Sequence, residues 1–170
     1  MEKLSPKEAG LERIRDLDVL STIPEMLALQ VEKRPDAVGW KSWDPVKKSW
    51  RDWTFRHEVQ RWRHAFAGLG LTRGTRVAML LPNCIEAVLF DQAALANALT
   101  PVPLHAIDTP KSSAYILNDS GAEVLVTNKK LKWRLVREAA ELPNLKLVVI
   151  TDDDFADDPD ADIPMLSLET

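Results

Sequence analysis

The histidines are the side chains of this sequence best suited to bind a metal ion or to transfer a proton. His57 and His64 lie two turns apart on one predicted helical face, about 10 Å from each other, whereas ligands of one metal ion, each bound at about 2 Å, lie much closer together. We therefore expect both to face solvent and predict no metal site. His105 follows the predicted strand 100–104 at its carboxyl end, where open α/β sheets bind ligands. It is a candidate substrate-proximal residue, with a plain loop histidine as the alternative.

Asn83 and Cys84 stand between a predicted strand and a predicted helix. The Asn83 side chain can accept a hydrogen bond from the first helical turn and Glu86 can reach back, so this pair is expected to cap the helix. Asn83 is the second substrate-proximal candidate. The helix dipole favours a thiolate at Cys84, but a nucleophile also needs an adjacent base, and none is identifiable. We expect Cys84 to be a small packed residue and assign no catalytic residue.

Neither the glycines nor the acidic residues form a cofactor motif. Gly68, Gly70 and Gly74 precede a predicted strand, whereas a phosphate-binding loop needs a strand, then glycines, then a helix. Residues 158–169 space their carboxylates as in a calcium loop, but Ile163 occupies the position where that loop requires glycine. We expect a solvated acidic segment there and no cofactor bound by this chain alone.

Segment 76–127 organises the chain, because its hydrophobic pattern predicts strand, helix, strand, helix, strand. Apolar runs rich in Val and Leu at its two ends predict strands covered on both faces. Helix 84–97 is apolar almost all round, which indicates burial. Thr109 followed by Pro110 begins the second helix, and residues 118–121 end it. Such a βαβαβ unit is of the α/β class and builds a parallel sheet with flanking helices.

A further helix and strand are predicted after this unit. The strand, 146–151, would be the fourth of the parallel sheet. Lysines and arginines between positions 129 and 137 form a basic face, which could meet an anionic partner but is more simply the solvated side of the helix. Asn128 is expected to cap this helix, and its inward residues are expected to be Leu131, Leu135, Ala139 and Leu142.

The residues before the βαβαβ unit predict a helix, a hairpin and a second helix. Thr22 and Glu25 form a capping box that begins a helix extending to about Lys33. Alternating segments around residues 44–48 predict a β-hairpin with a longer loop. Residues 55–69 carry apolar side chains at the spacing of one helical face.

Tryptophans dominate the predicted hairpin. Each strand carries two of them, three residues apart, so the two must point to opposite faces. With lysines between them they could stack nucleic-acid bases. A packed hairpin with lysines solvating its tip is the preferred interpretation, since no single face collects both rings and charges. These residues are Trp40, Trp43, Trp50 and Trp53.

Four stretches of the sequence resemble the N-terminal part of adenylate-forming enzymes, specifically the AMP-forming acyl-CoA synthetases. They are TIPEMLALQVEKRPDAVGW, WTFRHEVQRWRHAFAGLGLTRGTRVAMLLPN, LLPNCIEAVLFDQAALANALTPVPL and TPKSSAYILNDSGAEVLVT, and together they cover roughly Thr22 to Asp152. The ILNDSGA run and the residues before Thr109 look most like the long-chain fatty-acid branch.

The resemblance implies an enzyme that joins a carboxylate to AMP with MgATP and then transfers the acyl group to coenzyme A. Such chemistry needs a Ser/Thr/Gly-rich phosphate loop, an acidic residue for the ribose and a lysine from a C-terminal domain, and this sequence shows none of them. It is therefore expected to be an N-terminal fragment, incomplete for catalysis, whose partners are the remainder of the ligase chain and a fatty acid or other carboxylate. The alternative is a free-standing, non-catalytic binding or assembly module.

Composition sets the remaining expectations. The net charge of −4 comes from the segment after Thr151, which holds 8 acidic residues and no Lys or Arg. We therefore divide the chain into an N-terminal segment (1–21), an α/β body (22–151) and an acidic linker or tail (152–170). The body does not favour nucleic acid. One cysteine and an N-terminus without an apolar signal core predict a cytoplasmic location. Self-association is a further expectation, and contact with a membrane surface is left open.

Overall fold

The computed structural model describes residues 20–151 and 162–167. Its first element is helix α2 (Ile23–Lys33), which begins with the predicted capping box. The Thr22 hydroxyl accepts a hydrogen bond from the Glu25 backbone N–H at 3.3 Å, and the Glu25 carboxylate accepts one from the Thr22 N–H at 3.1 Å. Both bonds satisfy donors that a helix start otherwise leaves unpaired.

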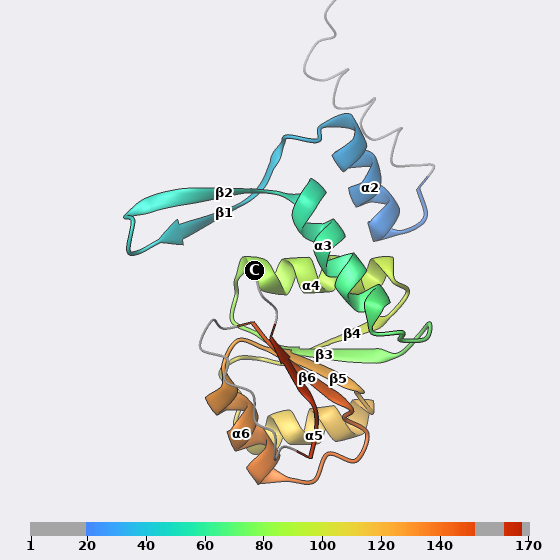
Figure 1. Ribbon diagram of the computed structural model, residues 1–170, viewed down its shortest axis with the longest axis vertical. Helices are drawn as coiled ribbons and strands as arrows, with labels where there is room; N and C mark the ends of the chain where they lie inside the picture. The colour runs from blue at the N-terminus through green and yellow to red at the C-terminus, as the bar shows by residue number, and fades with distance from the viewer. Residues whose placement is uncertain (1–19, 152–161, 168–170) are drawn as a thin grey trace, which may run out of the picture.

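Strands β1 (Val38–Asp44) and β2 (Ser49–Thr54) form the predicted antiparallel hairpin, which projects from the body of the molecule (Figure 1). Trp43 pairs with Trp50, and both side chains are exposed. Trp40 pairs with Trp53, and this pair packs partly buried against the core. The expectation that the two tryptophans of each strand point to opposite faces is confirmed.

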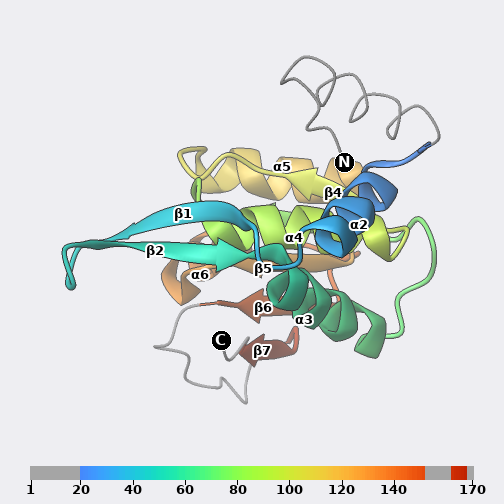
Figure 2. The ribbon, with the colours of Figure 1, turned by 90° about the horizontal axis from the view of Figure 1, so that it is seen from above.

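A five-stranded sheet lies at the centre of the molecule (Figures 1 and 2), with the order β4-β3-β5-β6-β7. Every neighbouring pair is parallel. Because β4 and β5 lie on opposite sides of β3, the connections from the carboxyl ends of β3 and β5 diverge. In an open α/β sheet this point of divergence is where ligands bind. The strands are β3 (Arg76–Leu80), β4 (Thr100–Pro103), β5 (Val124–Thr127), β6 (Leu147–Ile150) and β7 (Met165–Ser167).

Helices cover both faces of this sheet, as the predicted α/β class requires (Figure 1). Helices α3 (Phe55–Gly68) and α4 (Ile85–Ala96) pack on one face, where Trp62, Phe66 and Phe90 form an aromatic cluster with centroid distances of 5.5 to 6.5 Å. Every residue of α4 is buried or half-buried, which confirms the expectation drawn from its apolar pattern. None of the helices in the described residues is long and apolar enough to span a bilayer.

Helices α5 (Pro110–Ser120) and α6 (Lys130–Ala139) cover the other face. The boundaries of α5 match the prediction, because Thr109 accepts a hydrogen bond from the Ser112 N–H at 3.2 Å and Gly121 ends the helix with φ +62°. A left-handed backbone at that position costs a glycine little.

The predicted inward face of α6 is wrong in part. Leu131 and Leu135 are exposed, whereas Trp133 and Val136 are buried against the sheet. The apolar residues of this helix allow two faces, and the face with Trp133 removes the larger apolar surface from water. Asn128 does not cap the helix either, since Lys129 occupies the N-cap position and no side chain caps it.

The last described residues of the acidic segment contain a strand that the sequence pattern did not predict. Residues 165–167 form β7, which pairs in parallel with β6, and the Met165 side chain is buried. The Val148 N–H donates to the Pro164 carbonyl at 3.0 Å, and Asp162 forms a 2.8 Å ion pair with Arg137. A strand of three residues is too short to show a period of its own, which is why the sequence pattern missed it. The expectations for residues 1–19, 152–161 and 168–170 lie outside the described residues, and so do Asp158, Asp160 and Glu169 of the calcium-loop pattern.

Candidate functional site at the carboxyl edge of the sheet

Both substrate-proximal candidates lie at the carboxyl edge of the parallel sheet. Asn83 follows β3 and His105 follows β4, and both residues are exposed. Since β3 and β4 are neighbours, the two candidates belong to adjacent loops of the same edge. The strand order gives Asn83 the stronger position, because β3 borders the point where the connections diverge and β4 lies to one side of it.

Asn83 does not cap α4, which corrects the predicted pairing of Asn83 with Glu86. The helix begins at Ile85 with Cys84 as its N-cap, and no side chain caps its first turn. The chain leaves β3 through exposed Pro82 and Asn83, so the asparagine comes one residue too early to reach the helical N–H groups. Its amide is therefore exposed at the sheet edge without a capping role.

The other strand at the point of divergence, β5, ends in two polar residues. Thr127 is fully buried and donates its hydroxyl hydrogen to the Leu80 carbonyl at 3.0 Å, which ties the end of β5 to the end of β3. Asn128 follows it, and its side-chain oxygen is shielded from solvent yet accepts no hydrogen bond from the described residues. A buried acceptor without a donor destabilises the fold by about 1–3 kcal/mol, so a donor from a ligand or from further protein would stabilise this site.

Asn128 is the residue that sequence reasoning missed as a site candidate. The sequence signal was present, because a polar residue directly after a buried apolar strand marks the ligand edge of an α/β sheet. The sequence analysis instead interpreted Asn128 as a helix cap and therefore did not consider it as a site residue. With the cap excluded, Asn83 and Asn128 follow the two adjacent strands β3 and β5, where their amides can both donate and accept hydrogen bonds.

One side-chain and one backbone hydrogen bond hold the loop of His105 in place. Lys132 of α6 donates to the Ala106 carbonyl at 3.5 Å, and the Asp108 N–H donates to the His105 carbonyl at 3.0 Å. One lysine of the basic helix face thus has a structural partner at this edge. Within the described part of the chain, no group of three His, Cys, Asp or Glu side chains could hold a metal ion.

Cys84 lies near the same edge but packs against the core that α3 and α4 form. Burial, and to a smaller extent the neighbouring Glu86 side chain, raise the pKa of its thiol to about 11, while the nearby backbone N–H groups of Ala87 and Glu86 oppose the shift. The thiol is therefore protonated at neutral pH. A protonated, half-buried thiol is a poor nucleophile, in keeping with the expected packing role.

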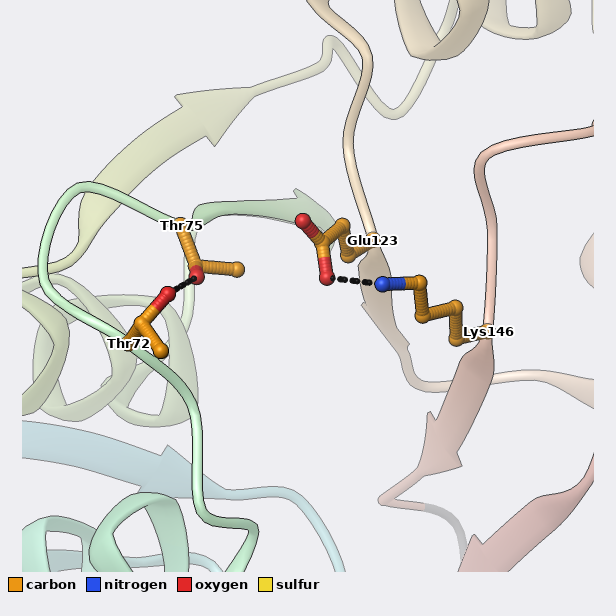
Figure 3. Close-up of polar contacts among 4 residues, drawn as sticks. All are labelled: Thr72, Thr75, Glu123 and Lys146. Atoms are coloured by element: carbon orange, nitrogen blue, oxygen red, sulfur yellow. Dashed lines mark hydrogen bonds and ion pairs between the residues drawn. The ribbon is translucent and has the colours of Figure 1, made fainter.

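The amino edge of the sheet, in contrast, is closed by contacts of the protein with itself (Figure 3). The hydroxyls of Thr72 and Thr75 lie 3.2 Å apart before β3, and Glu123 before β5 forms a 2.8 Å ion pair with Lys146 before β6. An exposed ion pair of this kind stabilises by about 0–1 kcal/mol. The first contact lies within the loop before β3, and the second joins the starts of β5 and β6. We place the candidate site at the opposite edge, where the strand order makes the connections diverge.

Comparison with known proteins assigns the chain to an enzyme family. Residues 27–165 match the family described as AMP-binding enzyme, and the chain therefore belongs to it. Among curated relatives, the chain is similar to a long-chain-fatty-acid–CoA ligase of Salmonella typhimurium, with 31% identity over 103 residues, 58% of this chain and 18% of the relative. It is also similar to the phosphinothricin tripeptide synthetase PhsB of Streptomyces viridochromogenes, with 29% identity over 123 residues, 72% of this chain and 10% of the relative.

A solved structure agrees with this assignment. The acyl-CoA synthetase of Brucella canis superposes with a TM-score of 0.61 and 25% identity, over 75% of this chain and 23% of that chain. The chain thus spans less than a quarter of the length of the proteins with which it is compared.

Proposed function

We propose that this chain is the N-terminal part of an ATP-dependent ligase that activates a carboxylate as acyl-AMP and transfers the acyl group to coenzyme A. The match of residues 27–165 to the AMP-binding enzymes carries this proposal. In such a reaction a carboxylate oxygen attacks the α-phosphorus of ATP and pyrophosphate leaves. The thiol of coenzyme A then attacks the acyl carbon and AMP leaves.

A fatty acid is the proposed carboxylate. The similarity to a long-chain-fatty-acid–CoA ligase supports this choice, as does the ILNDSGA run of α5. An amino acid is the competing substrate class, because a tripeptide synthetase is similar over a larger share of the chain. We further propose a cytoplasmic location, on the single cysteine of the sequence.

The residues present do not fit ATP and Mg²⁺ as ligands bound by this chain alone. The described residues hold no cluster of three possible metal ligands. Gly68, Gly70 and Gly74 precede β3, and Gly121 leads from helix α5 toward β5, so none of these glycines leads from a strand into a helix. We therefore propose that the nucleotide, the metal ion and coenzyme A bind the remainder of the ligase chain, which is the proposed partner of this part.

The first experiment measures pyrophosphate release by the chain alone with ATP, magnesium and a panel of fatty, aromatic and amino acids. We expect release at background level. The same assay on the chain extended by the coding sequence that follows Thr170 should show release that depends on a fatty acid. Activity of the chain alone that scales with its concentration and survives re-purification would contradict the proposed incompleteness. An extended chain that prefers amino acids would contradict the proposed substrate.

We propose that the carboxyl edge of the sheet borders the reaction site, with Asn83, His105 and Asn128 as substrate-proximal residues. In the extended chain, Asn128→Ala should lower kcat/KM by about 2- to 10-fold, as expected for the loss of one hydrogen bond to a bound ligand. Asn118→Ala is the matched control, because the Asn118 amide donates to the Glu141 carbonyl at the amino edge of the sheet. Equal effects of the two substitutions on kcat/KM would assign Asn128 a purely structural role.

A further inference from the structure

The tip of the β1–β2 hairpin exposes large apolar side chains that do not pack into the core of the described chain. Trp50 is 64% exposed, Trp43 is 50% exposed, and Val46 in the connecting loop is 89% exposed. The hairpin extends away from the central sheet and its helices (Figure 1), so the tip lies apart from the rest of the described chain. Large apolar side chains gathered at such a place mark an interaction surface.

The two exposed tryptophans form one continuous patch. They are direct cross-strand partners, and their rings meet edge to face with centroids 5.5 Å apart. On the opposite face of the hairpin, the Trp53 side chain already has partners within the hairpin. Its indole N–H donates to the Ser42 hydroxyl at 2.8 Å, and the Arg51 guanidinium lies 3.7 Å from its ring centroid. The unused apolar surface is therefore confined to the Trp43 and Trp50 face and to Val46.

Positive charge surrounds this patch. Lys47 and Lys48 are both exposed in the loop that joins the strands. The one acidic residue of the tip, Asp44, has its carboxylate bound within the loop, where it accepts the N–H groups of Val46 and Lys47 at 2.9 Å each. Lys41, further from the tip, is paired with Asp52 at 2.9 Å. Among the described residues, the tip thus combines exposed indole rings with two lysines that form no ion pair with a carboxylate.

We propose that the hairpin tip of Trp43, Val46, Lys47, Lys48 and Trp50 docks on an anionic lipid surface. Indole rings favour the boundary between headgroups and acyl chains, because they are large and apolar yet carry a polar N–H. Each lysine near an anionic leaflet adds attraction. This inference is independent of the proposed function, since it requires no ligase activity.

Two other occupants fit the tip less well. A nucleic acid would need open ring faces on which bases stack, whereas Trp43 and Trp50 meet each other edge to face. A second copy in a two-fold dimer would bring like surfaces together, so Lys47 and Lys48 would approach their own copies and repel. An anionic lipid surface offers both an apolar boundary for the indole rings and negative charge for the lysines.

The test uses the chain of 170 residues and sedimentation with vesicles of phosphatidylcholine, either pure or mixed with phosphatidylserine. We expect binding to the mixed vesicles that weakens as salt is added, with a blue shift of the tryptophan emission. Lys47→Glu/Lys48→Glu should lower the affinity by roughly tenfold or more. Trp43→Thr/Trp50→Thr should abolish the blue shift while circular dichroism confirms that the chain remains folded.

The matched control reverses two exposed basic residues elsewhere, Arg73→Glu/Lys111→Glu, which changes the net charge by the same amount. Retention of binding by the control and loss by the hairpin variant would support the proposal. Absence of wild-type binding at low salt would overturn it, as would equal losses in the two variants. Tighter binding to single-stranded DNA than to vesicles, or a dimer that dissociates on Trp43→Thr/Trp50→Thr without any vesicle binding, would assign the tip to another partner.

Discussion

Burial decides what Cys84 and Asn128 can do. Both stand at the start of a helix beside the carboxyl edge of the sheet, where the helix dipole would stabilise negative charge. At Cys84 the loss of water outweighs the dipole, and the pKa rises to about 11. At Asn128 the side-chain oxygen loses water without gaining a donor. Of the two groups, the neutral amide of Asn128 is therefore the one that we propose as a ligand contact.

The Cys84 thiol should react slowly with an alkylating reagent in the folded chain. Its pKa rises from the ordinary value of 9.0 to about 11, so at about pH 8 the thiolate fraction falls roughly a hundredfold, one factor of ten per pKa unit. Mass spectrometry after timed iodoacetamide treatment measures the rate. The chain unfolded in urea is the control, and native labelling as fast as in urea would show that the thiol is neither buried nor shifted. The native rate should rise with pH up to about 11, beyond the point at which the unfolded chain levels off.

Elements set by a few neighbouring residues were predictable from the sequence. The capping box of Thr22 and Glu25, the Thr109-Pro110 start of α5 and its end at Gly121 all depend on local hydrogen bonds and on φ, and the structure has them as expected. The face of α6 was not predictable from the spacing of its leucines, because it depends on the larger area that Trp133 buries against a sheet formed by distant residues.

The candidate site likewise has a part that depends on neighbouring residues and a part that depends on distant ones. Asn83 and His105 could be named because each follows a predicted strand. The point between the ends of β3 and β5, where the connections diverge, can be located only from the strand order. That order arises because the chain crosses from β4 over β3 and adds β5 on the other side of β3. Strand order is a non-local property, so the sequence pattern of each strand carries no record of it.

A pair of substitutions in α6 tests its orientation. Trp133→Ala should lower the free energy of unfolding by about 3–5 kcal/mol, because the indole is 2% exposed and packs under the sheet. Leu131→Ala, two residues earlier in the same helix, should change it by less than about 0.5 kcal/mol. Urea denaturation followed by circular dichroism measures both. A larger loss for Leu131→Ala than for Trp133→Ala would restore the helix face expected from the leucines.

Strand β7 should contribute to stability, although it lies in the segment that the sequence predicted to be solvated. Met165→Ala should cost about 2 kcal/mol or more, because this side chain is buried on β6. Leu166→Ala is the control on the adjacent, half-exposed position and should cost less than half as much. Thermal denaturation of both variants, and of a chain ending at Thr151, provides the comparison. An unchanged melting temperature in the shortened chain would show that β7 adds nothing to the fold.

Within the described residues, the two edges of the sheet differ in their ability to pair with a further strand. At the β4 edge, Pro101 and Pro103 lack the N–H groups that an added strand would need. At the other edge, α3 lies alongside β6 and β7 (Figure 2) but leaves an apolar hollow of about 180 Å³. The surface around β7 is therefore the part of this fold most able to receive further protein. The hollow is lined by Trp62, Ala65, Phe66, Leu69, Val126, Val149, Leu166 and Ser167.

The β7 edge should make the isolated chain self-associate at micromolar concentration. An exposed strand edge beside an apolar hollow favours pairing with a second copy, most simply as a two-fold dimer that buries the same surface twice. Leu166→Glu should produce a monomer near 19.1 kDa with a nearly unchanged fold, because this side chain lines the hollow and is 47% exposed. Leu131→Glu introduces the same charge on the opposite helical layer and should leave the dimer intact.

Light scattering coupled to gel filtration distinguishes the monomer from the dimer. A wild-type monomer over a wide range of concentration would exclude self-association, and dissociation by Leu131→Glu instead would place the interface on α6. In the extended ligase chain, Leu166→Glu should instead lower the melting temperature, because the added sequence is expected to cover the hollow that the second copy occupies in the isolated part.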